Sequence, residues 1–309
     1  MMKKNYSLKE SLFQRHISRK KESLYRWLTK DSLPLFLRGK DEISIHPQVY
    51  GYHEVRIKKL MAFAVENGQS DFLVDIGANI GLSTCQSGDL FKEVHCFEPN
   101  PDCFDILKVN TSIALKNAKL FLYKIGLGSD TKTLKLVVPK HNWGGAFVYD
   151  ENNTYSTELL ASKDGFNSFE WSNYNVVDIA IESANEVFKN LFSGLSARGL
   201  KKGFVKIDVE GYEPVVISAL ASQLPKDFEI TIVFESFDRA INIESVKESF
   251  SGRAEALQLV RTPEKREGLL ARIGKIITQR GYVWRFMAYD EKCKASDIVL
   301  IISNQNVTN

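Results

Sequence analysis

Short apolar runs alternate with longer segments of helical periodicity from Asp71 to the end of the chain. Seven of these runs have the length and apolar content of buried strands. They cover residues 71–75, 93–97, 118–125, 204–208, 229–234, 282–288 and 298–302. Strands that alternate with helices favour a mostly parallel sheet covered on both faces. The pattern therefore predicts an α/β fold with a doubly wound, mostly parallel, seven-stranded Rossmann-like sheet.

Helices are expected between the strands, at 80–90, 183–191 and 263–280. Another should begin at Pro101, because Asn100 before it is a suitable N-cap and an apolar stripe follows. Asn110 interrupts that stripe with a polar side chain. The last two strands are expected to pair with each other and to close the sheet.

The alternation does not extend over the whole chain. Residues 7–30 and 53–67 have helical periodicity, and a tract containing prolines separates them. We therefore divide the chain into an N-terminal helical appendage, 1–50, and a main domain, 51–309. After the third strand a further strand replaces the usual crossover helix, at 133–138, within a polar and aromatic stretch. An insertion is thus predicted at 129–175.

The net charge of the 309-residue chain is only +3, but its distribution is uneven. Residues 1–30 contain nine Lys or Arg and two acidic residues, a local net charge of +7. A packed helix, acting as a lid or a dimer contact, is the favoured interpretation of this arm. Contact with an anionic membrane is the alternative, because Leu24, Trp27 and Leu28 lie beside Arg26 and Lys30. No nucleic-acid partner is expected, since the chain after residue 30 carries a slight net negative charge.

The four cysteines show no C-x-x-C spacing and are interpreted as reduced thiols. The basic N-terminus lacks the apolar core of a signal peptide. No run approaches the ~18 apolar residues that a membrane span requires. We expect a soluble, cytoplasmic protein, with a peripheral contact to the inner face of a membrane as an alternative role for residues 1–30.

A glycine-rich turn follows the first strand and an acid closes the second. The turn contains Gly77, Asn79 and Gly81 after Asp75, and Glu98 ends the run 93–97. In doubly wound sheets such a turn lets the backbone approach a nucleoside ligand, while the second acid accepts hydrogen bonds from the ribose. These residues are therefore predicted to bind an adenosine cofactor.

The turn favours S-adenosylmethionine over NAD. A dinucleotide needs G-x-G-x-x-G to receive its pyrophosphate, and that spacing is absent here. Asp75 would repel a pyrophosphate but attract the ammonium group of a methionine moiety. The structural alternatives are that Asp75 caps the turn and that Glu98 is a solvated strand end.

A second acidic cluster follows the strand at 204–208. Asp208 and Glu210 lie at the edge of the sheet where ligands bind, and Glu235 ends the next strand. Asp208 or Glu210 could accept the proton of an attacking hydroxyl. Alternatively, two or three of these acids could hold a divalent metal ion. The structural alternative is that Glu210 and Glu213 cap the following helix.

These segments resemble the FkbM family of S-adenosylmethionine-dependent methyltransferases over residues 73–235. The similarity covers 74–81, Phe97-Glu98-Pro99-Asn100-Pro101, Gly126-Leu127-Gly128 and, most distinctively, 206–213. It implies a methyltransferase sheet with extra strands after the third, and adds Pro99, Asn100 and Gly126 to the cofactor site. It also implies O-methylation, commonly of sugar or natural-product hydroxyls. Residues 1–50 and those past 240 have no clear counterpart in the family, so the resemblance does not identify the methyl acceptor of this protein.

The insertion is rich in aromatic residues, among them Trp143, Trp171 and Tyr174. Such rings suit a sugar, so residues 139–175 are interpreted either as an acceptor lid or as a hairpin that packs its own aromatics. His141 is a further candidate base, although a lone loop histidine is more often solvated. The competing hypotheses for the whole chain are an NAD-dependent oxidoreductase or epimerase and a non-catalytic binding module.

Overall fold

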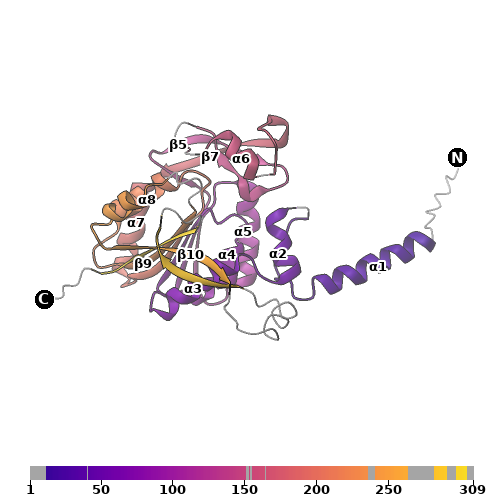
Figure 1. Cartoon of the computed structure of the whole chain (residues 1–309), viewed down its shortest axis with the longest axis horizontal. Helices are drawn as coiled ribbons and strands as arrows, with labels where there is room; N and C mark the ends of the chain where they lie inside the picture. Colours follow the sequence, from indigo (N-terminus) through magenta and orange to yellow (C-terminus); the bar gives the residue numbers. More distant parts are fainter. Residues whose placement is uncertain are drawn as a thin grey trace, which may run out of the picture.

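A central sheet of eight strands organises the protein (Figure 1). The computed structural model describes residues 12–39, 41–150, 153, 155–163, 165–235, 241–263, 282–290 and 297–304. The strand order is β11-β10-β12-β9-β8-β1-β2-β3. The strands are β1 (Phe72–Ile76), β2 (Glu93–Phe97), β3 (Lys119–Tyr123), β8 (Lys202–Ile207), β9 (Glu229–Glu235), β10 (Ala254–Pro263), β11 (Tyr282–Ala288) and β12 (Asp297–Ile302). β3, β2, β1, β8 and β9 run parallel, which confirms the predicted mostly parallel α/β sheet.

Helices cover both faces of this sheet (Figure 1). They are α3 (Val55–Glu66), α4 (Leu82–Ser87), the short η1 (Gly88–Leu90), α5 (Pro101–Ala114), α7 (Ala184–Ala197), α8 (Glu213–Gln223) and α9 (Ile243–Ser249). Val74 of β1 packs in one core with α7 and α8, whereas the adjacent Leu73 packs in another with α3 and α5. All five residues of β1 are therefore buried, as expected for a parallel strand covered on both sides.

The prediction of seven strands was wrong at the carboxyl-terminal edge of the sheet. β10 lies between β11 and β12 and pairs antiparallel with both, so these two strands do not pair with each other. Thr262 and Pro263, expected to begin a helix, instead end β10. The rest of that expected helix lies outside the described residues. The first part of β10 is rich in Ala, Glu, Leu and Gln, which favour helices, and its strand conformation comes from pairing with β12.

A second sheet of four strands, in the order β4-β7-β5-β6, is formed by residues 126–183. This region extends beyond the predicted insertion, 129–175, at both ends, and 126–183 is called the insertion from here on. The strands are β4 (Gly126–Gly128), β5 (Lys132–Pro139), β6 (Phe147–Val148) and β7 (Tyr174–Ser183), with η2 (Trp143–Gly145), α6 (Thr157–Lys163) and η3 (Trp171–Asn173) between them. The expected strand at 133–138 is confirmed within β5. β7 pairs with β5 along eight residues, which makes this hairpin the frame of the insertion.

Two helices precede α3. α1 (Leu12–Leu28) confirms the helix expected at 7–30 and extends away from the body, and α2 (Glu42–Tyr50) lies against the body (Figure 1). α2 was not predicted, because Pro47 lies inside it and proline disfavours a helix interior.

The polar residue in the stripe of α5 fastens the N-terminal segment to the body. Asn110 is fully buried, and its side chain accepts a hydrogen bond from the Phe36 N–H (2.7 Å). Its amide nitrogen donates to the Phe36 carbonyl (3.1 Å) and to the Ile80 carbonyl (2.8 Å). Leu35, Leu37 and Ile43 pack nearby on Ile80, Leu82 and Cys103. Residues 35–43 are thus attached to the helix and turn that border the predicted cofactor site.

Replacing Asn110 by Ala is expected to lower the free energy of unfolding by about 2–4 kcal/mol, because it leaves the buried Ile80 carbonyl and the partly buried backbone groups of Phe36 without their hydrogen-bond partner. Urea denaturation measures the loss, and limited proteolysis should cleave the variant near residues 30–40 faster than the wild type. Ser112→Ala on the exposed side of α5 is the control and should change stability by less than about 0.5 kcal/mol. Equal stability of the two variants would contradict the fastening role.

Candidate active site

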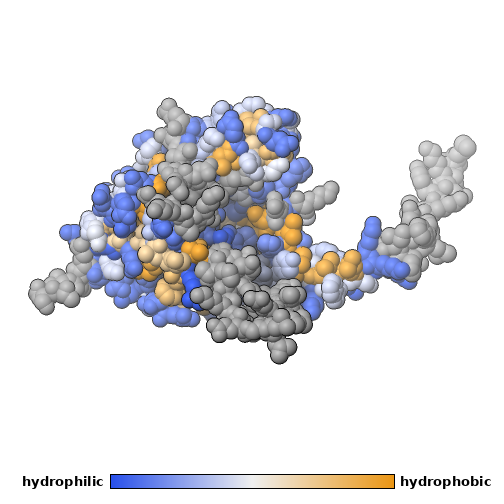
Figure 2. Space-filling model, in the orientation of Figure 1, coloured by the Kyte–Doolittle hydropathy of each residue, from blue (hydrophilic) through white to orange (hydrophobic). Residues whose placement is uncertain are grey.

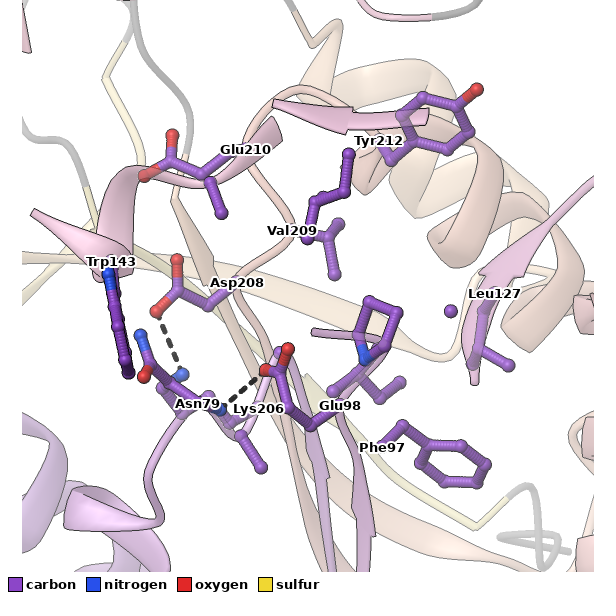
Figure 3. A pocket seen from close by; sticks show the side chains of 18 of the residues that line it. Asn79, Phe97, Glu98, Leu127, Trp143, Lys206, Asp208, Val209, Glu210 and Tyr212 are labelled. Atoms are coloured by element: carbon purple, nitrogen blue, oxygen red, sulfur yellow. Dashed lines mark hydrogen bonds and ion pairs between the residues drawn. The ribbon is translucent and has the colours of Figure 1, made fainter. Parts of the chain in front are cut away.

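A pocket of about 300 Å³ opens at the carboxyl ends of β1, β2 and β8 (Figure 3). This is the edge at which open α/β sheets bind ligands. The three strands and β9 contribute Gly77, Asn79, Glu98, Pro99, Lys206, Asp208, Glu210 and Glu235. The insertion adds Gly126, Trp143 and Ile179, and the N-terminal part adds Ile43, His53 and Glu54. Segments that lie far apart in the sequence therefore build one cavity.

The glycine-rich turn has a backbone conformation that ordinary side chains resist. Gly77, Asn79 and Gly81 have φ angles of 79°, 52° and 86°. The Gly77 and Ala78 N–H groups both donate to the Phe97 carbonyl at 3.0 Å. A Cβ atom on Gly77 would lie 1.8 Å from the Asp208 carbonyl oxygen. The turn after β1 is thus pressed against the loop after β8, and glycine at position 77 permits that approach.

Glu98 is held by the backbone at the entrance of this turn. One carboxylate oxygen accepts from the Asn79 N–H and the other from the Asn100 N–H, each at 2.7 Å. Each oxygen can accept a further hydrogen bond, so both remain able to bind the hydroxyls of a ribose. Glu98, Pro99 and Gly126 line the pocket, whereas Asn100 does not; its side chain caps α5 at the Asp102 N–H.

Binding of S-adenosylhomocysteine is expected to be about tenfold weaker at pH 6 than at pH 8. Burial raises the pKa of Glu98 to about 7, although two backbone N–H groups stabilise its charge. Below that pKa the free protein carries a proton on Glu98, and ribose hydroxyls prefer the ionised carboxylate, so binding must release the proton. Calorimetry in buffers of different ionisation enthalpy measures this release at pH 6–7.

The variant Glu98→Gln serves as the control, because it cannot release a proton from this position. It should bind S-adenosylhomocysteine about 10–100-fold more weakly at pH 8 and lose the pH dependence. The assignment of Glu98 would be contradicted by proton release that persists in the variant.

A buried lysine connects the two acidic positions predicted from the sequence. The Lys206 ammonium donates to Asp208 at 2.9 Å and lies 3.5 Å from Asp75 (Figure 3 draws the first contact). Burial opposes the charge of Lys206, but Asp208 and Asp75 raise its pKa above the ordinary range. The ammonium therefore stays protonated at the floor of the pocket.

Asp75 does not line the pocket. Its side chain has no exposed surface and accepts a 2.6 Å hydrogen bond from the Thr84 hydroxyl. Burial raises its pKa, and the nearby Lys206 opposes that change. The sequence led us to expect the ammonium of a methionine moiety beside Asp75, whereas the ammonium there belongs to Lys206. Asp75 is thus connected to the pocket through its ion pair with this lysine.

The loop after β8 is a constrained turn. Glu210 has a φ of 49°, and Glu213, almost fully buried, accepts hydrogen bonds from the Val209 and Gly211 N–H groups. The Asn153 amide donates to the Glu210 carbonyl at 2.9 Å and so ties the insertion to the loop. Glu213 therefore has a structural role, but it holds the loop before α8 through Val209 and Gly211, which lie outside the helix that the capping alternative supposed it to cap. Glu210 faces the pocket.

The candidate metal ligands share the pocket without forming a recognisable metal site. Asp208, Glu210 and Glu235 all line it. Within the described ranges, no group of three or more His, Cys, Asp or Glu side chains is arranged to hold a metal ion. The Lys206 ammonium instead supplies positive charge beside Asp208.

The aromatic residues of the insertion divide into two groups. Trp143 borders the pocket, and the Arg38 guanidinium lies 3.9 Å from the centre of its ring. Phe147, Tyr155 and Tyr174 instead form a separate core within the insertion. His141 is exposed and is not among the residues lining the pocket, so its place in the structure does not support a role as base.

Two pocket residues were missed by the sequence analysis. His53 and Glu54 lie before α3, and their side chains approach to 3.5 Å. Gln86 on α4 holds His53 in place by bonding both its N–H and its carbonyl at 2.8 Å. Burial lowers the pKa of His53 to about 4 and raises that of Glu54 to about 7. The two hydrogen bonds between the Gln86 side chain and the His53 backbone join residues far apart in the sequence, so no local pattern predicts them.

Comparison with known proteins agrees with this geometry. Residues 75–282 match the family model described as the methyltransferase FkbM domain. The methyltransferase sdnD of Sordaria araneosa is 29% identical over 157 residues, which span 48% of this chain and 60% of that protein. The hexuronic acid methyltransferase AglP of Haloferax volcanii is 26% identical over 168 residues, 54% of this chain and 67% of that protein.

Among solved structures, one that matches is the O-methyltransferase from Bacillus cereus in complex with S-adenosylhomocysteine. It is 10% identical, with a TM-score of 0.39 over 97% of this chain and 94% of that one. The family model covers well over half of the chain, including the glycine turn, Glu98 and the loop after β8. This protein therefore belongs to the FkbM family of S-adenosylmethionine-dependent methyltransferases.

Proposed function

We propose that the protein transfers the methyl group of S-adenosylmethionine to a hydroxyl group of a sugar or a related natural product. The observation that carries the proposal is that Glu98 and Asp208 border one pocket (Figure 3). Glu98 suits the ribose of a nucleoside, and Asp208 suits the proton of a nucleophile. Their common cavity supports both tasks in a single site.

The cofactor, when bound, supplies an electrophilic methyl group on a sulfonium ion. The turn from Gly77 to Gly81 and the Glu98 carboxylate are the groups that would hold it. Asp208 would accept the proton of the acceptor hydroxyl as the oxygen attacks. Lys206 and Asp75 act by positioning Asp208. The Lys206 ammonium donates a hydrogen bond to Asp208 and forms an ion pair with Asp75. Alignment of the oxygen with the methyl group is the other contribution of the pocket.

The acceptor side of the pocket supports a polar, ring-shaped substrate. Trp143 offers an aromatic face of the kind that packs on sugar rings, and Glu210 and His53 offer hydrogen-bonding groups around it. A sugar acid is the substrate class named for AglP. That relationship is distant, so we extend only the class of acceptor, a sugar, to this protein.

Incubation with methyl-labelled S-adenosylmethionine and a panel of acceptors tests the proposal. The panel contains nucleotide sugars, glycolipids, hydroxylated natural products, nucleic acid and protein. We expect label on a sugar or natural-product hydroxyl as an alkali-stable methyl ether, which mass spectrometry locates. Label confined to nitrogen, to nucleic acid or to protein would contradict the proposed function.

A further inference from the structure

α1 presents an apolar face that has no covering in the described part of the chain. Every side chain from residue 19 to residue 28 is exposed. The exposed fractions of Leu24, Trp27 and Leu28 are 55%, 65% and 38%. These residues share one helix face, because they are three or four positions apart. Such a group of large apolar side chains on a projecting helix indicates an interaction surface.

The charges around this face indicate what kind of surface it meets. Lys20 and Lys21 lie one turn before Leu24 on the same side of the helix, and Arg19 and Arg26 are exposed as well. Glu22 is the single acidic residue between positions 19 and 28. Lysine side chains can extend from an apolar face toward anionic groups while their methylene stems stay in contact with it.

We propose that α1 lies on an anionic lipid membrane, with Leu24, Trp27 and Leu28 inserted at the headgroup boundary. A basic amphipathic helix with tryptophan on its apolar face has the composition of an interfacial helix. Pairing of this face with a second copy is less favourable, because it would bring together two helices whose exposed charges are mostly basic, among them Lys20, Lys21 and Arg26. No helix among the described residues is long and apolar enough to span a bilayer, so the contact is with the surface.

The segment after α1 contacts α2, which borders the pocket, so a membrane bound by α1 would lie near the pocket. Figure 2 shows apolar side chains along α1 and over α2 on the same face of the molecule, and Ile45 and Tyr50 of α2 are more than half exposed. The Leu33 N–H after α1 donates to the Pro47 carbonyl in α2. α2 in turn contributes Ile43 to the lining of the pocket. Docking through α1 would thus hold the pocket near the membrane, and it does not depend on the proposed function.

Sedimentation with vesicles tests the inference on the full chain. We expect binding to vesicles that contain phosphatidylglycerol, at least tenfold weaker binding to pure phosphatidylcholine, and a steep loss with added salt. The variant Trp27→Glu should reduce binding at least tenfold. The doubly substituted Lys20→Gln, Lys21→Gln protein should bind about 25-fold more weakly, at roughly fivefold for each basic residue.

Trp171→Glu is the matched control, because Trp171 is also exposed, at 53%, but lies in the insertion. It should bind vesicles like the wild type, and circular dichroism should give all variants the melting temperature of the parent. Equal binding to neutral and anionic vesicles, or equal loss in Trp27→Glu and Trp171→Glu, would overturn the inference. So would a wild-type dimer in light scattering that Trp27→Glu converts to monomer without any vesicle binding by either protein.

Discussion

Replacing Asp208 by Asn is expected to lower methyl transfer by about 10²–10⁴-fold, the contribution typical of a proton acceptor in the transition state. The affinity for S-adenosylhomocysteine should change by less than about threefold, because the ribose is assigned to Glu98. Asn keeps the shape of the side chain and an oxygen that can still accept a hydrogen bond from Lys206, and Asp75 remains beside that lysine. Single-turnover kinetics with the labelled donor, together with calorimetry, measure the two effects separately.

The control for this change is Asp178→Asn on β7, an exposed acid paired with Lys135 at the surface. The Asp178→Asn variant should keep the methyl-transfer rate and the S-adenosylhomocysteine affinity of the wild type. If Asp208→Asn retained full turnover, the proton acceptor would have to be sought among Glu210, Glu235 and His53, which line the same pocket.

Replacing Gly77 by Ala is expected to abolish detectable cofactor binding and to destabilise the fold by about 3 kcal/mol or more. The added methyl group would lie 1.8 Å from the Asp208 carbonyl oxygen, at a φ of +79° that alanine also resists. Neither backbone can move alone, because Gly77 and Ala78 donate to Phe97 and the Asp208 N–H donates to Ile76. Calorimetry and urea denaturation measure the two losses.

The variant Gly68→Ala separates the clash of the added methyl group from the strain of alanine at a positive φ. Gly68 has a similar φ, 81°, but no atom lies within 4 Å of the position of its Cβ. That variant should lose about 1–2 kcal/mol of stability and keep its cofactor affinity. A Gly77→Ala protein that behaved like Gly68→Ala would show that the turn is not pressed against the loop after β8.

The sequence predicted the parallel part of the fold because its strands are buried on both faces and carry continuous apolar runs. It failed at β10, whose first residues, 254–258, favour a helix and pair with residues 298–302 of β12, across a long stretch of chain. It also failed at α2, which contains Pro47 in its interior and whose Pro47 carbonyl accepts a hydrogen bond from the Leu33 N–H. In each case the structure depends on contacts that no local pattern records.

The candidate site shows the same division. The place of the turn and of Glu98 at the pocket could be predicted, because the glycines and the carboxylate directly follow consecutive strands of the sheet. His53 and Glu54 could not, because only the folded chain brings the segment before α3 over the pocket. Asn110 had a signal, a polar residue in an apolar stripe, but its partners Phe36 and Ile80 became apparent only in the structure.

The most direct test of the account is calorimetric titration of the protein with S-adenosylhomocysteine and, separately, with NADH. We predict saturable binding of one S-adenosylhomocysteine per chain, weakened about 10–100-fold by Glu98→Gln, and no binding of NADH. Tighter binding of NADH, or S-adenosylhomocysteine binding that Glu98→Gln leaves unchanged, would contradict the assignment of this turn and this carboxylate to the methyl donor.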